Sequence, residues 1–465
     1  MNLGISKEVS KRIAPAYFEL QSETQKVFSK NPQKYFQKHE EKMNKSSPEV
    51  MRLSLPRRKR WLGLMPISME LGFIQEPEVV EIIVELLSEE DCKISNLARK
   101  IAQNSSATRN SINLAASYMP DATTNLGNLD HTLFHHKFEM AGAPLFQITD
   151  TLAEQLNDTD IGKSTPCLFL KQPYPMMYIE YGQNPFSGIK IYNRQSQWHD
   201  LEGMYLNSVH YPDEQLSEDI DDGLFDLEGA DKETKSNMFT HAYQSGHVKK
   251  GGGDIQVIEV LATGSPVGKG SNFDDATVFF ILIVQDPEMS VQELIDWHRK
   301  YYKGELPTQE SLESSLEGID INVHKSSVMS PQDAESFPKV VEAITKSLLY
   351  INSETAIRES VKEVAELKKK INRTSNKAKK RKLLQQGGQA LDYIRVGISN
   401  NDLNEEISIN VSKQAGTKKT HWRRAHFREQ AYGKGRALRK IRWIPRRMIN
   451  ANSIIGLDTK PYRVT

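Results

Sequence analysis

Positively charged and aromatic side chains are interleaved in a short stretch near the end of the sequence, from Thr417 to Arg447. Lysine and arginine can neutralise phosphates, and flat rings can stack on bases, which together bind single-stranded nucleic acid. Each stacked base contributes about 1–3 kcal/mol, and each neutralised phosphate makes the affinity depend on salt. The side chains that we predict to contact RNA are His421, Arg423, Arg424, His426, Phe427, Arg428, Tyr432, Lys434, Arg436, Arg439 and Arg442.

The pattern within this stretch predicts two strands, at 421–432 and 436–444, joined by a turn at Gly433-Lys434-Gly435. Alternation gives the first strand one face with His421, Arg423, Ala425 and Phe427, and another with Trp422, Arg424, His426 and Arg428. In the second strand, the face with Leu438, Lys440, Arg442 and Ile444 lies opposite Arg439, Ile441 and Trp443. We expect Trp422 and Trp443 to serve a core, which leaves Phe427, Tyr432 and the guanidinium planes for bases. The alternative is a small β domain whose rings are all core and whose arginines are merely solvated.

Other residues that could do chemistry do not complete a site. His131, His135 and His136 have helical spacing, but the glutamate of a zinc protease motif and any further ligand at the right distance are missing, so we expect surface or partly buried histidines. The segment from Gly264 to Ser271 resembles a P-loop, yet it is one residue short before Gly-Lys, and a strand follows it instead of a helix. We predict a hairpin loop there. No catalytic residue, metal ion or small-molecule cofactor is predicted.

Charge is distributed very unevenly along the 465 residues, although the formal net charge is only +1. Residues 361–465 carry 26 Lys and Arg against 8 Asp and Glu, a net of +18, which leaves −17 for residues 1–360. Such asymmetry is typical of a nucleic-acid surface at one end, while two halves that neutralise each other are the alternative. With two cysteines and no apolar run long enough to cross a bilayer, we expect a cytoplasmic protein without membrane contact.

The periodicities predict an α+β fold in four parts. A helical N-terminal region covers 1–125 and includes a helix at 81–87, and an α+β central domain covers 126–335. In the central domain we expect a helix at 145–156, strands at 167–170, 177–181 and 255–261, a central buried strand at 277–284 and a helix at 290–302. Residues 336–400 are expected to form a long helix from Pro338 to about Ile371, followed by a basic linker. A basic β-rich module covers 401–465 and begins with a strand at 407–411.

The C-terminal stretch resembles the C-terminal signature of type V-A anti-CRISPR proteins, which phages and plasmids carry. The resemblance rests on the run His421-Trp-Arg-Arg-Ala-His-Phe-Arg, the Gly-Lys-Gly turn, and Lys440-Ile-Arg-Trp-Ile-Pro followed by Ile449-Asn450. A second patch, Ser164-Thr-Pro-Cys-Leu-Phe-Leu and then Met177-Tyr-Ile-Glu, is similar to two apolar strands of the family. Ala425 stands where the family usually has glycine.

This resemblance implies an inhibitor that evades host defence by lowering production of the effector nuclease, through its translation or through degradation of its mRNA. The partners would be mRNA or ribosomal RNA at the basic module, and the nascent chain of the effector. Two alternatives stay open. One is a ribonuclease that uses His421 and His426 as acid and base, although no carboxylate partner is evident. The other is a phage or plasmid protein-interaction factor that does not bind RNA.

Overall fold

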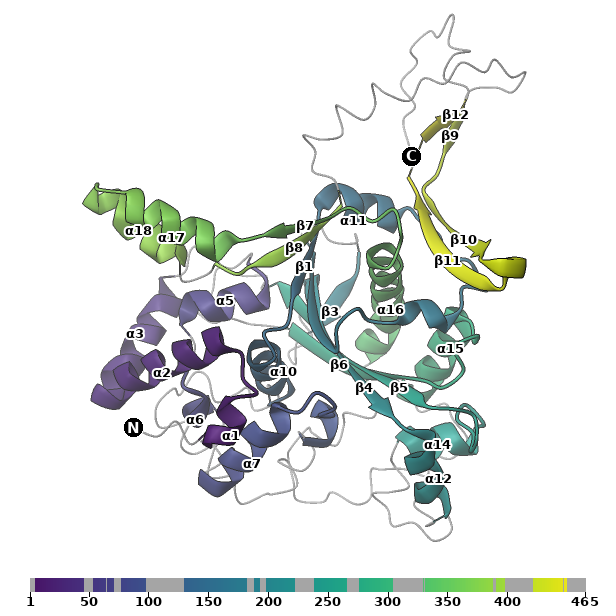
Figure 1. The fold of residues 1–465 in the computed structure, drawn as a ribbon, viewed down its shortest axis with the longest axis horizontal. Coiled ribbons are helices and arrows are strands. Elements are labelled where there is room, and N and C mark those ends of the chain that lie inside the picture. The colour runs from purple at the N-terminus through teal and green to yellow at the C-terminus, as the bar shows by residue number, and fades with distance from the viewer. Residues whose placement is uncertain are drawn as a thin grey trace, which may run out of the picture.

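The computed structural model describes residues 5–45, 53–63, 65–70, 77–97, 129–181, 188–192, 198–221, 238–265, 276–303, 329, 331–387, 390–397, 421–445 and 447–449. Within these ranges, eight strands form one mixed sheet in the order β6-β5-β4-β2-β1-β8-β7, with β3 paired to β4 (Figure 1). The strands of this sheet are β1 (Leu145–Ile148), β2 (Met176–Tyr181), β3 (Lys190–Tyr192), β4 (Trp198–Tyr211), β5 (Ile255–Ser265), β6 (Ala276–Val284), β7 (Arg358–Val361) and β8 (Tyr393–Val396).

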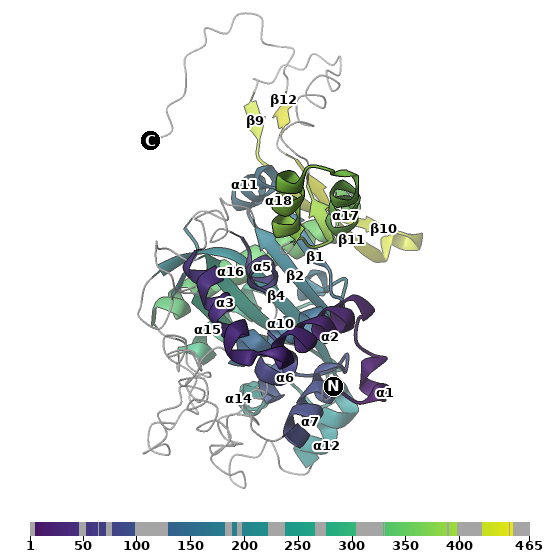
Figure 2. The same cartoon turned by 90° about the vertical axis from the view of Figure 1, so that its left-hand side faces the viewer.

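Helices cover both faces of the sheet. In Figure 2 the helices of the N-terminal part lie on the side of the sheet that faces the viewer. They are α1 (Lys7–Ser10), α2 (Pro15–Lys30), α3 (Pro32–Asn44), α5 (Leu55–Leu62), α6 (Ile67–Glu70), α7 (Pro77–Leu87) and α10 (Leu129–Met140). The later helices are α11 (Asp150–Asn157), η2 (Cys167–Leu170), α12 (Asp213–Asp221), α14 (Met238–Gln244), α15 (Val291–Tyr302), α16 (Pro331–Ile351), α17 (Glu363–Arg373) and α18 (Lys377–Gly387).

Alternation along the central strands divides the apolar side chains between two cores. On β2, Tyr178 joins the core that the N-terminal helices form, whereas Met177 and Ile179 join the core beneath α11, α15 and α16. All six residues of β2 are buried, as expected of a strand covered on both faces. The predicted α+β class is confirmed. The predicted boundaries between the four parts stay a prediction.

Several predicted elements are confirmed. The helix at 81–87 lies within α7, and the strands at 177–181 and 255–261 lie within β2 and β5. The helix at 290–302 begins with a capping box, in which Ser290 Oγ accepts the Glu293 N–H at 3.2 Å and Glu293 Oε2 accepts the Ser290 N–H at 2.9 Å. The strand at 407–411 lies outside the described residues.

Three predictions for the central domain were wrong. Residues 145–148 form strand β1 instead of helix, and the helix α11 starts only after Thr149, whose hydroxyl caps it. Residues 167–170 form a 3-10 turn, because an apolar run of four residues does not distinguish a strand from a buried turn. The strand at 277–284 was predicted to be central, but it lies at the end of the described sheet. An unbroken apolar run indicates that the faces of a strand are covered, and it does not indicate that the strand has a neighbour on each side.

The predicted long helix was wrong in its bounds and continuity, and the predicted basic linker was wrong. Helix α16 begins at Pro331 and ends at Ile351, and the chain then enters strand β7. The apolar stripe continued past the end of α16 because Ile357, which directly precedes β7, and Val361, which ends β7, keep the helical spacing by chance. The basic residues that follow are helical: they form α17 and α18, which pack as a helical hairpin between β7 and β8 (Figure 1).

Candidate nucleic-acid interface

The basic segment folds as an antiparallel hairpin of β10 (His426–Tyr432) and β11 (Leu438–Ile444). The turn contains Gly433 and Gly435 with φ of 79° and 65°, a left-handed backbone that glycine adopts without a steric cost. Arg436 also has a positive φ, of 59°, and this exposed arginine closes the short 3-10 turn η5 (Lys434–Arg436). The predicted hairpin and its Gly-Lys-Gly turn are therefore confirmed.

The first predicted strand, 421–432, is interrupted. His421–Arg423 form β9, which pairs with β12 (Arg447–Ile449), and β10 starts only at His426. Ala425, buried to 5% exposure, lies between the two strands. For His421 the structure describes the backbone alone. The predicted single strand was therefore wrong, and its alternation does not extend across Ala425.

One face of the β10–β11 hairpin packs against the end of α16. Trp443 is buried and donates its backbone N–H to Ser353 Oγ at 2.9 Å, while Thr355 Oγ1 donates to the Trp443 carbonyl at 3.0 Å. The Trp443 ring lies between Tyr350 and Phe427, with centroids 5.6 and 5.0 Å away. Trp443 serves the core, as expected. Phe427 was predicted to be available for bases, but this half-buried ring packs against Trp443 and the core instead.

The opposite face of the hairpin is exposed and carries like charges directly across from one another. Arg428 pairs in register with Arg442, and both side chains are exposed. Arg442 Nη1 donates to Gln430 Oε1 at 3.2 Å, which leaves most of its donors free to contact a ligand. Tyr432 is 41% exposed at the turn end of the same face, and the Lys440 ammonium lies 5.0 Å from its ring centroid. Like charges opposite each other destabilise a strand pair, so this pairing favours a bound anion.

Two cations of the hairpin are neutralised by carboxylates. Arg439 Nε lies 3.1 Å from Glu429 Oε1, and Lys440 Nζ lies 2.8 Å from Glu354 Oε1. No described carboxylate lies within ion-pair distance of the remaining predicted cations, which are Arg423, Arg424, Arg428, Lys434, Arg436 and Arg442. The described acidic residues therefore leave these six side chains free to contact a ligand.

His426 does not have the surroundings of a general acid or base. Its Nε2 accepts from Arg423 Nη2 at 3.1 Å, and its Nδ1 donates to the Arg424 carbonyl at 3.2 Å. Both contacts are to neighbours in its own segment, and no described carboxylate orients the ring. This arrangement places the ring beside an arginine and gives no support to acid–base cleavage of RNA.

The three histidines of α10 are buried, so the expectation of surface or partly buried side chains was wrong. His135 Nδ1 lies 2.9 Å from Tyr205 Oη, and His136 Nδ1 lies 2.6 Å from Tyr17 Oη. Burial holds the pKa of His131 and that of His135 well below the ordinary value. In the part of the chain that the structure describes, no three His, Cys, Asp or Glu side chains are placed to share a metal ion.

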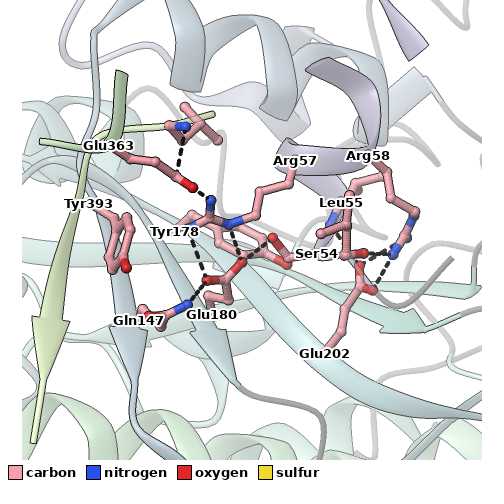
Figure 3. A network of polar contacts seen from close by, with 12 residues as sticks. Ser54, Leu55, Arg57, Arg58, Gln147, Tyr178, Glu180, Glu202, Glu363 and Tyr393 are labelled. Atoms are coloured by element: carbon pink, nitrogen blue, oxygen red, sulfur yellow. Dashed lines mark hydrogen bonds and ion pairs between the residues drawn. The ribbon is translucent and has the colours of Figure 1, made fainter. Parts of the chain in front are cut away.

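A buried network of charges, which the sequence did not reveal, joins the N-terminal helices to the sheet (Figure 3). Arg57 on α5 donates Nε to Glu180 Oε1 at 2.9 Å and Nη1 to Glu363 Oε2 at 2.8 Å, and Gln147 Nε2 donates to Glu180 Oε2 at 2.8 Å. Beside it, Arg58 pairs with Glu202. Burial alone would lower the pKa of Arg57, but the two carboxylates outweigh it and raise that pKa. The one sequence signal was an acid, Glu180, inside an apolar strand.

No helix in the described part of the chain is long and apolar enough to span a membrane. The two cysteines, Cys92 and Cys167, are free and buried, and burial raises their pKa to about 11 and about 12. These thiols therefore stay protonated near neutral pH and are not nucleophiles.

The fold and the surface define an α+β protein with an exposed basic hairpin. Comparison of its sequence with protein families places it in a class that acts against bacterial immunity. The AcrVA2-like family model, described as the anti-CRISPR type V subtype A2 family, matches residues 146–451. The chain belongs to this family, and the resemblance seen in its sequence is confirmed. Membership makes it a protein of the anti-CRISPR class, with which phages and plasmids evade host defence.

The match begins within β1 and ends just after β12, so it includes the sheet except for the first residue of β1, together with the basic hairpin. The crystal structure of AcrVA2 aligns with 82% of this chain and 98% of that one, at 13% identity and a TM-score of 0.38. A search of curated proteins finds no match.

Proposed function

We propose that this anti-CRISPR protein lowers production of the type V-A effector nuclease by binding RNA, either its message or ribosomal RNA, through the β10–β11 hairpin. The observation that carries the proposal is the exposed Arg428–Arg442 pair, in which two arginines occupy directly opposite positions of the hairpin and no described carboxylate lies within ion-pair distance of either. A phosphate placed between them would accept hydrogen bonds from both arginines and remove their repulsion.

The rest of the hairpin supports the same ligand. Lys434 and Arg436 extend the positive surface around the turn, and Tyr432 offers a partly exposed ring on which a base can stack. The docked face keeps the hairpin in place, because Trp443 and Ile441 are buried against the end of α16 and Phe427. In this proposal the body of the protein contacts the nascent chain of the effector while the hairpin contacts RNA.

The test is to express the protein beside a type V-A effector gene and to measure the effector's mRNA and protein. Wild type should lower both, and Arg428→Gln with Arg442→Gln should abolish the effect. The matched control, Arg428→Lys with Arg442→Lys, keeps both charges and should retain part of it. If wild type leaves both levels unchanged, or if the double Gln variant suppresses them as strongly as wild type does, the proposal is wrong.

Binding of purified protein to labelled RNA gives an independent measurement. Affinity should fall as salt rises, and the double Gln variant should show a log–log slope shallower by about 0.7, since the two arginines share one phosphate and each phosphate contact on a single strand contributes about 0.7. Crosslinking in cells, followed by sequencing, identifies the RNA and shows whether it is message or ribosomal.

A further inference from the structure

A second basic surface lies before the β10–β11 hairpin in the chain, in a separate element. Strands β7 and β8 pair antiparallel, with Arg358 opposite Val396 and Val361 opposite Tyr393, and the chain between them forms α17 and α18. Figure 1 shows these two helices side by side, extending away from the sheet beyond β7 and β8. None of the residues of α17 is buried. The helical hairpin is therefore an exposed projection from the body.

The tip of this projection is strongly cationic. The sequence from 367 to 391 contains no Asp or Glu, and the two acids of α17, Glu363 and Glu366, lie at its base. No described carboxylate lies within ion-pair distance of the exposed cations around the tip, which are Lys368, Lys369, Lys370, Arg373, Lys377, Lys379, Lys380 and Lys382. We call these eight side chains the tip cations.

Helix α18 places its cations where helix electrostatics oppose them. Its N-terminus is capped by Asn376, whose Oδ1 accepts the Lys379 N–H at 3.1 Å, and Lys377, Lys379 and Lys380 occupy the first turn. The positive end of the helix dipole favours acidic side chains or anions at this position, and neighbouring lysines repel one another. A bound polyanion would reverse both effects, since it would neutralise the lysines and complement the dipole.

The base of the projection is fixed to the body by polar contacts. Glu363 accepts from Arg57 Nη1 at 2.8 Å and from the Leu391 N–H at 3.2 Å, and Asp392 Oδ1 accepts the Val364 N–H at 3.1 Å. The Arg57 guanidinium also lies 4.9 Å from the ring centroid of Tyr393 in β8. These contacts fix the direction in which the helical hairpin leaves the sheet.

We propose that the tip cations form a second RNA contact, which holds the phosphodiester backbone without reading bases. The segment from 362 to 392 has no aromatic side chain, so it cannot stack on bases or supply the aromatic core typical of a protein interface. The aliphatic side chains of α17, which are Val364, Leu367 and Ile371, are half-buried, so they do not offer the exposed apolar face that inserts into a lipid surface. That the polyanion is RNA rests on the proposed function, whereas the affinity for a phosphate backbone rests on the helical hairpin alone.

The experiment compares full-length variants for binding to a labelled RNA duplex of mixed sequence. In one variant Lys377, Lys379, Lys380 and Lys382 are changed to Gln, and in a second the same four are changed to Arg. A third variant changes Lys26, Lys30, Lys34 and Lys38, which are exposed on α2 and α3, to Gln and so removes the same net charge elsewhere. Far-ultraviolet circular dichroism and thermal unfolding check that every variant folds.

The first variant should bind RNA at least tenfold more weakly at low salt, with a slope of log affinity against log salt shallower by up to about 3.6, since each lost duplex contact removes about 0.9. The second and third variants should bind like wild type. Amide exchange in α18 should slow when RNA is added to wild type. Wild-type affinity in the first variant, or an equal loss in the third, overturns the inference.

The outcome separates this inference from the proposed function. If the first variant binds like wild type while Arg428→Gln with Arg442→Gln loses affinity, the helical hairpin is not an RNA contact and the proposed function stands. If the first variant loses affinity while wild type leaves effector levels unchanged, the RNA contact stands and the proposed function fails. Binding of poly-glutamate or of anionic vesicles through the same lysines, without binding of RNA, would overturn the inference in favour of an acidic protein or a membrane.

Discussion

Arg57 Nε on α5 lies 2.9 Å from Glu180 Oε1 on β2, so an N-terminal helix and a central strand meet through a buried pair of opposite charges. The side chain of Glu180 is only 6% exposed, and it also accepts hydrogen bonds from Ser54 and Gln147. Every oxygen of this carboxylate is therefore satisfied. Because Arg57 also contacts Glu363, one guanidinium links three distant segments of the chain.

Arg57→Met should lower the free energy of unfolding by about 3–5 kcal/mol, because it leaves the charge of Glu180 buried without its partner. Urea unfolding at neutral pH measures the change. The double variant with Glu180→Met should recover much of the loss, since it removes the uncompensated charge as well. A double variant less stable than Arg57→Met would show that the pair is not the source of the effect.

Ser353→Ala should loosen the β10–β11 hairpin. The Ser353 hydroxyl is fully buried and accepts the Trp443 N–H, and leaving that donor unpaired costs about 1–3 kcal/mol. Hydrogen exchange should become faster in β10 and β11, while β4 and β5 keep their protection. Ser88→Ala, which removes an exposed hydroxyl, is the control and should change neither. Uniformly faster exchange would contradict a local docking role.

Glu429→Gln should raise the affinity for RNA. This exposed carboxylate neutralises Arg439, and its removal frees a cation for phosphate, so we expect roughly a two- to fivefold gain at low salt and a steeper salt dependence. Glu359→Gln breaks a similar exposed pair with Arg395 on the far edge of the sheet, and it should have no effect. Equal affinities for wild type and Glu429→Gln would place Arg439 outside the interface.

The protein should lose stability as pH falls below about 6.5. Burial and the neighbouring His247 lower the pKa of His298 to about 3, and its ring is held neutral, with Nε2 accepting the Ile283 N–H and Nδ1 donating to the Leu294 carbonyl. The unfolded chain takes up the proton near pH 6.5 and the folded chain does not, so stability is complete above 6.5 and decreases toward pH 3.

Urea unfolding between pH 6 and pH 5 measures this effect. His298 should contribute about 1.4 kcal/mol per pH unit to the slope, and His298→Gln, which cannot take up a proton, should be shallower by that amount. Identical slopes for the two proteins would show that His298 is protonated equally in the folded and unfolded states.

Sequence patterns predicted the elements that are determined by residues close together in the chain. The β10–β11 hairpin follows from alternation and a Gly-Lys-Gly turn, and α15 follows from Ser290 and Glu293 at capping-box spacing. The sequence did not predict the end of α16, because the residue that interacts with the chain just after it lies far away in the sequence. The hydroxyl of Ser353 accepts the backbone N–H of Trp443, ninety residues further along the chain, together with that of Thr355.

The exposed site was predictable in composition but only partly in geometry. The sequence identified the cations of the hairpin, but which of them a carboxylate neutralises depends on Glu354, an acid from the body, as well as on Glu429. Phe427 was misplaced because alternation assigns a residue to a face, and whether that face is covered depends on α16. Most of α17 was predicted as the end of the long helix, whereas α18 was predicted as a linker because its basic sequence has little apolar periodicity.

The parallel pairing of β1 with β8 affects the order in which the protein can be made. Leu145 lies opposite Tyr393 and Ile148 opposite Val396. During synthesis, β1 therefore cannot pair with β8 until residues 393–396 have left the ribosome. Until then one edge of β1 presents unpaired backbone groups, a template for aggregation. Premature termination before residue 393 would leave that edge open, and such fragments should accumulate in inclusion bodies.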